Sequence, residues 1–370
     1  MKATTELPDD AALPGLAAIR ASGLAAAMPA LGLDDRPVEL TLRGYTPGSR
    51  ATFEVRAGDR HFALKLYAED PEPEAELYEA LAAVGLVGEG PVRVPPLLAR
   101  DRSLQVLAIG WLEGPTGQEL LKGRRGERAG ELAACWLRCA AALPVKVGLP
   151  LGAAHMVYNA GKEVVQLDAA DRGLGSAARR LARILTQTLP KNGSRRLLHG
   201  TFYARHVLDQ GDGVGVIDWE RFGRGPLELD AGMFLATAWR YGLDHAPLAA
   251  EAARAEEALL AGTTGLLDER VLAWHRAAAL LRLASKVYVV ERRKENWLDR
   301  AHALLTEATR LAELAARPDP VARVEAPALR LNGAALELIL RALSTRPATP
   351  EELDQIRKLL DERKQRDQNA

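Results

Sequence analysis

The sequence has few cysteines and aromatic residues, no net charge and no long hydrophobic run. Two cysteines among 370 residues do not make a disulfide framework. Lys plus Arg total 49, as do Asp plus Glu, so no net field draws the chain to nucleic acid or anionic lipid. No apolar run approaches about 18 residues, which excludes a membrane span, and the N-terminus MKATTELPDD lacks a signal-peptide layout. These features predict a cytoplasmic protein without nucleic-acid or membrane partners.

The composition is that of an ordinary globular protein, with 48% hydrophobic and 26% charged residues. After position 37, apolar and polar residues alternate in three segments, which is typical of half-buried strands. These segments are residues 38–42, 52–56 and 61–67, and a helical pattern from Pro73 to about Val84 and a strand near 104–111 follow them. One or two short helices are expected before this β-rich region.

Beyond residue 114 helical patterns dominate. They are interrupted by two short apolar strands, at 197–199 and 215–218, and a Pro-rich linker at 318–327 precedes helical patterns at 328–342 and 351–364. We therefore predict four parts, an N-terminal helical extension (1–37), a small β-rich lobe (38–113), a helical lobe (114–317, with a catalytic-loop region at 197–230) and a linker with C-terminal helices (318–370). A ligand is expected in a cleft between the lobes. The C-terminal helices either dock on their own domain or bind a protein partner.

Lys65 lies in the middle of the third predicted strand, between apolar neighbours. Such a lysine either runs its stem along apolar surface to reach water or points at an anion. Three acids on the next predicted helix, Glu74, Glu76 and Glu79, are candidate partners. Acids near the start of a helix also suit its dipole, so each of them has a purely structural explanation as well.

A turn over residues 45–52 joins the first two predicted strands. The backbone amides of Gly48 and Ser49 in such a turn could face a phosphate group. The alternative is a plain hairpin turn, which this composition also favours.

The segment that begins at His199 holds further candidates. Asp218 ends a short apolar strand, where a carboxylate is poorly solvated unless it meets a metal or another cation. Asp230 follows a Gly-Pro pair and is expected to cap or brace this loop.

Together these segments resemble the aminoglycoside phosphotransferase and choline kinase-like family of small-molecule kinases. The family signature reads H-G-D-x-x-x-x-N-V-L, then I-D-W-E or I-D-x-D, then G-x-P-x-x-D. The chain matches it at His199-Gly200, Val207-Leu208, Ile217-Asp218-Trp219-Glu220 and Asp230, and the strand around Lys65 resembles the family's lysine strand. The resemblance covers roughly residues 38–315. It implies an α+β, two-lobed protein-kinase-like fold with a small β-rich N-lobe and a larger helical C-lobe.

The resemblance also implies ATP and Mg²⁺ as cofactors and a small-molecule hydroxyl as acceptor. The connector at residues 107–114 would meet the adenine. By this resemblance the cofactor-binding residues are Lys65, Gly48, Ser49 and one of Glu76 or Glu79 to orient Lys65, and the metal-binding residues are Asp218 and His206.

Two positions depart from the family pattern. The catalytic Asp of the family falls on Thr201, beside His199, and the metal-binding Asn falls on His206. A threonine cannot act as a base near neutral pH, and imidazole suits softer ions than Mg²⁺. We therefore expect an ATP-binding pseudokinase or a very weak phosphotransferase. The alternative is an active kinase for an unknown metabolite, with Glu220 or His206 as a relocated base.

Overall fold

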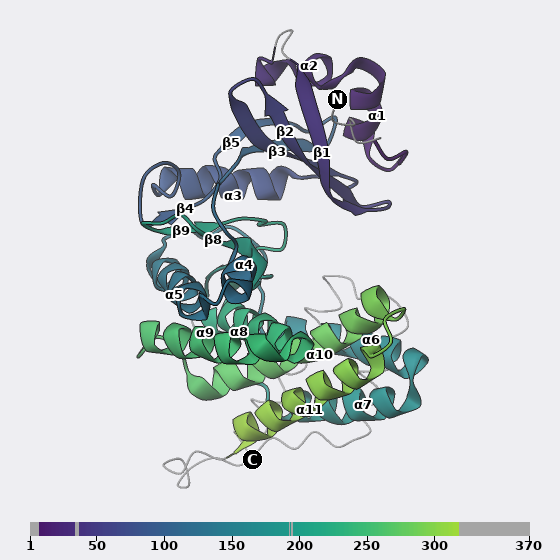
Figure 1. Ribbon diagram of the computed structural model, residues 1–370, viewed down its shortest axis with the longest axis vertical. Helices are drawn as coiled ribbons and strands as arrows, with labels where there is room; N and C mark the ends of the chain where they lie inside the picture. The colour runs from purple at the N-terminus through teal and green to yellow at the C-terminus, as the bar shows by residue number, and fades with distance from the viewer. Residues whose placement is uncertain (1–6, 34–36, 192, 194, 318–370) are drawn as a thin grey trace, which may run out of the picture. The chain divides into compact units, whose positions relative to one another are not determined.

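The computed structural model describes residues 7–33, 37–191, 193 and 195–317 (Figure 1). The chain falls into two compact units, one of residues 1–152 and 191–276 and the other of residues 153–190 and 277–370. Helix α10 (Glu269–Glu291) contributes to both. The predicted linker and both predicted C-terminal helices lie outside the described residues.

The first unit begins with a five-stranded antiparallel sheet. In spatial order its strands are β1 (Val38–Thr46), β2 (Arg50–Ala57), β3 (Arg60–Tyr67), β6 (Val106–Gly110) and β5 (Leu97–Asp101). The three strands predicted from alternation are confirmed, as are the strand near 104–111 and the helix after residue 73, which is α3 (Glu72–Ala83). The short strand β5 has no clear alternation and was not predicted.

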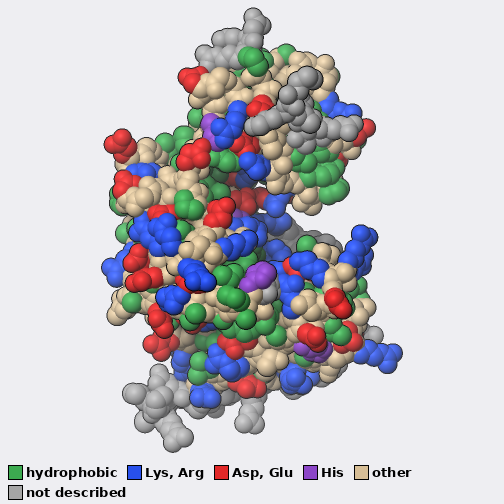
Figure 2. All heavy atoms as spheres, in the orientation of Figure 1, with side chains coloured by type: hydrophobic (Ala, Val, Ile, Leu, Met, Phe, Trp, Pro, Cys, Tyr) green, Lys and Arg blue, Asp and Glu red, His purple; other side chains and the backbone are tan. Residues whose placement is uncertain are grey.

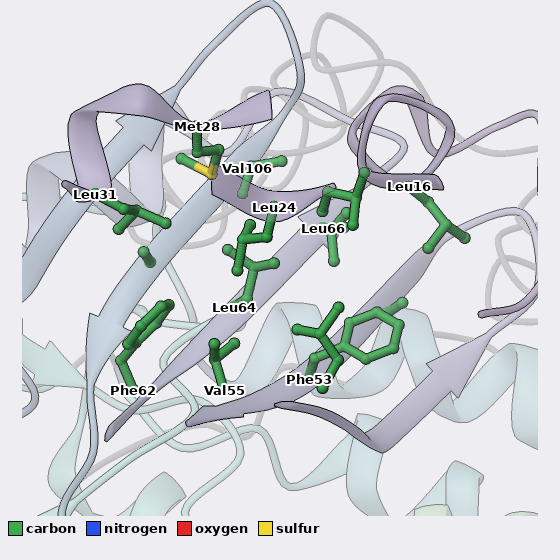
Figure 3. Close-up of a cluster of buried hydrophobic side chains, with 14 of the residues drawn as sticks. Leu16, Leu24, Met28, Leu31, Phe53, Val55, Phe62, Leu64, Leu66 and Val106 are labelled. Carbon is green, nitrogen blue, oxygen red and sulfur yellow. The ribbon is translucent and has the colours of Figure 1, made fainter. Parts of the chain in front are cut away.

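One face of this sheet is covered by the short helices that precede it, α1 (Pro14–Ser22) and α2 (Leu24–Ala27), with a turn of 3-10 helix at Pro29–Leu31. Figure 3 shows Leu16, Leu24, Met28 and Leu31 lying over the sheet. The strand residues beneath them are Phe53, Val55, Phe62, Leu64, Leu66 and Val106. The helices expected before residue 38 are therefore present, and they complete the core of the sheet.

Because side chains alternate along a strand, the residues between these core positions project from the opposite face. Lys65 lies on that face of β3, directly across from Thr52 on β2. Next to it Tyr67 and Leu107 are buried with Ala75 of α3. The core on one face thus fixes which residues face α3 on the other.

The rest of the first unit is mainly helical. Its helices are α4 (Gly117–Lys122), α5 (Gly126–Ala142), α8 (Leu227–Asp244) and α9 (Ala249–Gly262), with 3-10 turns at Ala204–His206 and Ala246–Leu248. A three-stranded sheet holds β4 (Val92–Arg93), β9 (Val214–Val216) and β8 (Val207–Asp209), and a two-stranded sheet holds β10 (Gly223–Gly225) and β7 (Arg196–Leu198). Strands β7, β8, β9 and β10 lie within or at the start of the region, residues 197–230, that the sequence marked as the catalytic loop.

The second unit consists of α6 (Ala153–Ala170), α7 (Arg172–Gln187), the later part of α10, and α11 (Trp297–Ala316). These helices agree with the helical patterns that dominate the sequence beyond residue 114. Arg180 of α7 and His302 and Arg310 of α11 line a groove of about 360 Å³.

Acidic and basic side chains are interspersed over the face shown in Figure 2, in keeping with their equal numbers in the sequence. Across residues 7–33, 37–191 and 195–317, no helix combines the length and the apolar character needed to cross a membrane.

His275 on α10 is fully buried, and neither of its ring nitrogens has a hydrogen-bond partner within the described part of the chain. Burial lowers its pKa to about 3. Below about pH 6.5, His275 is protonated in the unfolded chain but stays neutral in the folded protein. The free energy of unfolding therefore falls as the pH drops from about 6.5 toward 3.

We predict that His275→Leu removes this pH dependence. Relative to wild type, the variant should gain about 1 kcal/mol of unfolding free energy between pH 6 and pH 5. Urea unfolding at the two pH values measures the difference, and His302→Leu, an exposed position on α11, is the control. A constant difference between H275L and wild type at both pH values would contradict the prediction.

Candidate functional site

The site is organised around Lys65, whose side chain is buried (4% exposed) on the α3 side of the sheet. Its Nζ lies 2.5 Å from Oε1 of Glu74 and 3.6 Å from Oδ1 of Asp218. The hydroxyl of Tyr67 donates to Oε2 of Glu74 at 2.6 Å. A buried ammonium group needs such partners, because desolvation otherwise disfavours its charge. Of the two behaviours considered for this lysine, the structure shows the one in which it points at anions.

The expectation that Glu76 or Glu79 orients Lys65 is wrong. Both side chains are exposed, and Glu79 pairs instead with Arg100. The buried face of α3 comprises Glu74, Ala75, Leu77, Tyr78 and Leu81. The spacing i, i+3, i+4, i+7 places Glu74 on the apolar stripe, so the helical period could have identified it.

In the turn at residues 45–52, the backbone N–H groups of Gly48 and Ser49 donate hydrogen bonds to other groups of the chain. Gly48 has φ +69°, and its N–H donates to Oδ2 of Asp10 at 2.8 Å, as does the hydroxyl of Tyr45 at 3.0 Å. The N–H of Ser49 donates to the carbonyl of Thr46 at 3.0 Å. A carboxylate from the N-terminal extension therefore lies where the sequence suggested a phosphate, and the cofactor role of Gly48 and Ser49 stays a prediction.

The loop that follows β7 is held by Asp230, as the sequence predicted. Oδ2 of Asp230 accepts the N–H of His199 at 2.6 Å, and Oδ1 accepts the N–H of Gly200 at 2.9 Å. Burial raises the pKa of Asp230 to about 7, although both donors favour the anion. Gly200 has φ +77°, and a Cβ there would meet the carbonyl of Arg221. A glycine at position 200 is thus required by the path of the backbone.

His199 is fully buried and fixes the loop to the segment after β9. Its Nε2 lies 2.8 Å from the carbonyl oxygen of Ile217, and its Nδ1 lies 3.3 Å from the amide nitrogen of Thr201 and 3.5 Å from the Thr201 hydroxyl. These partners assign the neutral tautomer with the proton on Nε2. Burial lowers the pKa of His199 to about 4, so its imidazole is neutral and a poor proton acceptor at neutral pH.

His206 is equally committed to internal contacts. Its Nδ1 lies 2.9 Å from the carbonyl oxygen of Thr201, and the Nε–H of Arg205 donates to its Nε2 at 3.0 Å. The same Nε2 lies 3.3 Å from Oδ2 of Asp218. Burial lowers the pKa of His206. The proton of the ring is on Nδ1, and the lone pair of Nε2 accepts the hydrogen bond from Arg205. The ring therefore has no free lone pair with which to coordinate a metal.

Asp218 follows β9 in a left-handed conformation, with φ +67°. The neighbouring Trp219 is fully buried, donates from Nε1 to the carbonyl of Val216 at 3.0 Å and packs edge-on against Trp136. This anchor turns Asp218 toward Lys65. Burial opposes ionisation of Asp218, but the nearby cationic groups, Lys65 first, lower its pKa well below its usual range.

Glu220 of the same segment forms an ion pair with Arg50, the first residue of β2. Sequence reasoning did not find Arg50, Tyr67 or Arg205. An arginine at a strand end carries no local pattern that sets it apart from the other arginines of the chain. Its contact with Glu220 joins segments 170 residues apart, which no short-range spacing reveals.

The arrangement thus combines the buried Lys65 and the arginine Arg50 with three carboxylates, those of Glu74, Asp218 and Glu220. Thr201 is joined to it through His206, which contacts the Thr201 carbonyl and Asp218. Lysine and arginine are suited to binding an anion such as phosphate. These groups are poorly suited to general-base catalysis. The Thr201 side chain is a hydroxyl, and the imidazoles of His199 and His206 are buried and neutral.

A model of the phosphotransferase enzyme family matches residues 41–267 of the chain. Among solved structures, a choline/ethanolamine kinase family protein from Mesorhizobium loti is similar, with 18% identity, coverage of 88% of this chain and 99% of that chain, and a TM-score of 0.53. Aminoglycoside phosphotransferase APH(4)-Ia, in ternary complex with ADP and hygromycin B, shares 15% identity over 79% of this chain and 98% of its own, with a TM-score of 0.53. The gentamicin complex of APH(2")-IIa shares 14% identity over 77% and 97%, with a TM-score of 0.51.

A comparison with curated proteins finds no match. The solved structures confirm the predicted α+β, two-lobed kinase-like fold.

We predict that Glu74→Gln destabilises the protein strongly, because it leaves the buried Lys65 ammonium underpaired. Removing one partner of a buried ion pair costs about 3–5 kcal/mol. Glu76→Gln, on the exposed face of the same helix, is the matched control and should change stability by less than about 0.5 kcal/mol. Urea unfolding of both variants measures the effect. Equal losses in E74Q and E76Q would contradict the pairing described above.

Proposed function

Because the chain belongs to the phosphotransferase enzyme family, we propose that it binds ATP at the Lys65 site and has lost most or all phosphoryl-transfer activity. The observation that carries this proposal is the contrast within the site. The phosphate-binding lysine is paired and in place, while the catalytic-loop position that needs a carboxylate holds Thr201.

Nucleotide binding has support from both the site and the family. Glu74 holds the Lys65 ammonium at a fixed place, as the family's lysine requires in order to contact phosphates. The similar APH(4)-Ia structure is a complex with ADP. Asp218 faces Lys65 as a carboxylate, because Lys65 and the other cationic groups nearby lower the pKa of Asp218 well below its usual range.

Loss of transfer follows from the absence of a suitable base beside Thr201. A general base typically contributes about 10²–10⁴-fold to a rate. In the free protein neither residue considered as a relocated base faces the Thr201 side chain, since Glu220 pairs with Arg50 at the start of β2 and the Nε2 of His206 faces Arg205. A hydroxyl acceptor bound at Thr201 would find no carboxylate at that position to take its proton.

The side chains around Asp218 do not fit a magnesium ion. Mg²⁺ takes oxygen ligands in near-octahedral geometry at about 2.0–2.1 Å. Here Asp218 offers one carboxylate that faces Lys65, Glu220 faces Arg50, and the position of the family's second metal ligand holds His206, whose Nε2 faces Arg205. Over the described ranges of the chain, no three His, Cys, Asp or Glu residues form a group that could hold a metal. The expected metal roles of Asp218 and His206 therefore lack support from this geometry.

We predict that the double variant Thr201→Asp, His206→Asn gains phosphoryl transfer that the wild type lacks. Purified proteins would be tested for ADP release from ATP with hygromycin B, gentamicin and choline as acceptors, the compounds named for similar proteins. The gain should be about 10²-fold or more.

Thermal unfolding with ATP at about 100 times its dissociation constant should show about 2.7 kcal/mol of stabilisation in both the wild type and the double variant.

The matched control is Thr201→Ala with His206→Asn, which changes the same positions but supplies no carboxylate. Wild-type turnover at about 1–100 per second would contradict the pseudokinase proposal and favour an active small-molecule kinase. An absence of any ATP-dependent shift in the wild type would contradict nucleotide binding itself.

A further inference from the structure

Both acids of the Asp218–Glu220 segment face side-chain cations of the sheet. The Nζ of Lys65 lies 3.6 Å from Oδ1 of Asp218, and Arg50 forms an ion pair with Glu220. In kinases of this fold, the acid at the position of Asp218 holds a metal ion that in turn contacts phosphates. Here the positive charge opposite the acids comes from the protein.

Arg50 and Lys65 leave the sheet on the same face. Thr52 lies directly opposite Lys65 in the β2–β3 register, and Arg50 is two residues before Thr52 on its strand. Side chains two apart on a strand share a face, so Arg50 is a diagonal neighbour of Lys65. Arg50 also follows the Gly48-Ser49 turn directly. Two cationic side chains thus stand beside each other at the end of the sheet nearest that turn.

The surroundings of Arg50 leave it able to change partners. Its side chain is 36% exposed, whereas Lys65 is locked in the buried pair with Glu74. An ion pair at a partly exposed position holds its members weakly. A phosphate group, like a carboxylate, accepts two parallel hydrogen bonds from a guanidinium, and it carries the higher negative charge. A bound phosphate group is therefore a stronger partner for Arg50 than Glu220 is.

We propose that Arg50 takes the place of the divalent cation in this protein, so that Arg50 and Lys65 together bind the nucleotide phosphates without metal. In the free protein Glu220 holds Arg50 at the site, and on binding Arg50 moves from Glu220 to the phosphates. This inference rests on the proposed nucleotide binding and specifies how it is achieved.

The test is calorimetric titration of the full-length protein with ADP, in excess EDTA and in excess Mg²⁺. We expect wild type to bind ADP in EDTA with an affinity within about threefold of that in Mg²⁺, a difference well below the tenfold that 1.4 kcal/mol represents. Arg50→Gln should weaken binding in EDTA by about tenfold or more, because it removes charge-assisted hydrogen bonds. Arg102→Gln, an exposed arginine paired with Asp70, is the matched control and should bind like wild type.

Glu220→Gln separates the two possible roles of the acid. If Glu220 only holds Arg50, E220Q should bind ADP in EDTA as tightly as wild type or more tightly. Binding that needs Mg²⁺ and is lost in E220Q would overturn the inference while leaving nucleotide binding intact. Equal affinity of R50Q and wild type in EDTA would overturn it as well. Failure of wild type to bind ADP in either buffer would instead overturn the proposed function.

Discussion

A lysine ammonium buried between a sheet and a helix persists only where carboxylates reach it, and the site follows from that requirement at Lys65. The β2–β3–β6 register places Lys65 on the face opposite the core packed by α1 and α2. Glu74 is the acid that the buried stripe of α3 brings to it, and Tyr67 holds the second oxygen of Glu74. Asp218 approaches from the segment after β9, anchored by the buried Trp219.

The loop from His199 to His206 has a well-defined scaffold but no carboxylate at Thr201. Asp230 accepts hydrogen bonds from the amides of His199 and Gly200, and His199 ties the loop to Ile217, just after β9. This scaffold and the paired Lys65 therefore support a protein that holds an anionic ligand, and the neutral groups at Thr201 and His206 argue against proton transfer.

Much of this architecture could be predicted because it depends on short-range patterns. Alternation identified β1, β2 and β3, and the signature at His199, Asp218 and Asp230 indicated the family and the fold that the comparisons confirm. Strand β5 was missed because it lacks alternation. Glu74 was passed over for more exposed acids, although the helical period marks it. Arg50 lay beyond reach, since its contact with Glu220 depends on the assembled fold.

The most direct test of this account is a double-mutant cycle between Lys65 and Glu74. The free energies of unfolding of wild type, K65M, E74Q and the K65M/E74Q double variant, measured in urea, give their coupling energy. A buried, hydrogen-bonded ion pair should show a coupling of about 2–3 kcal/mol, with the double variant more stable than E74Q alone. A coupling near zero would mean that the two side chains do not depend on each other, and would contradict the account of the site.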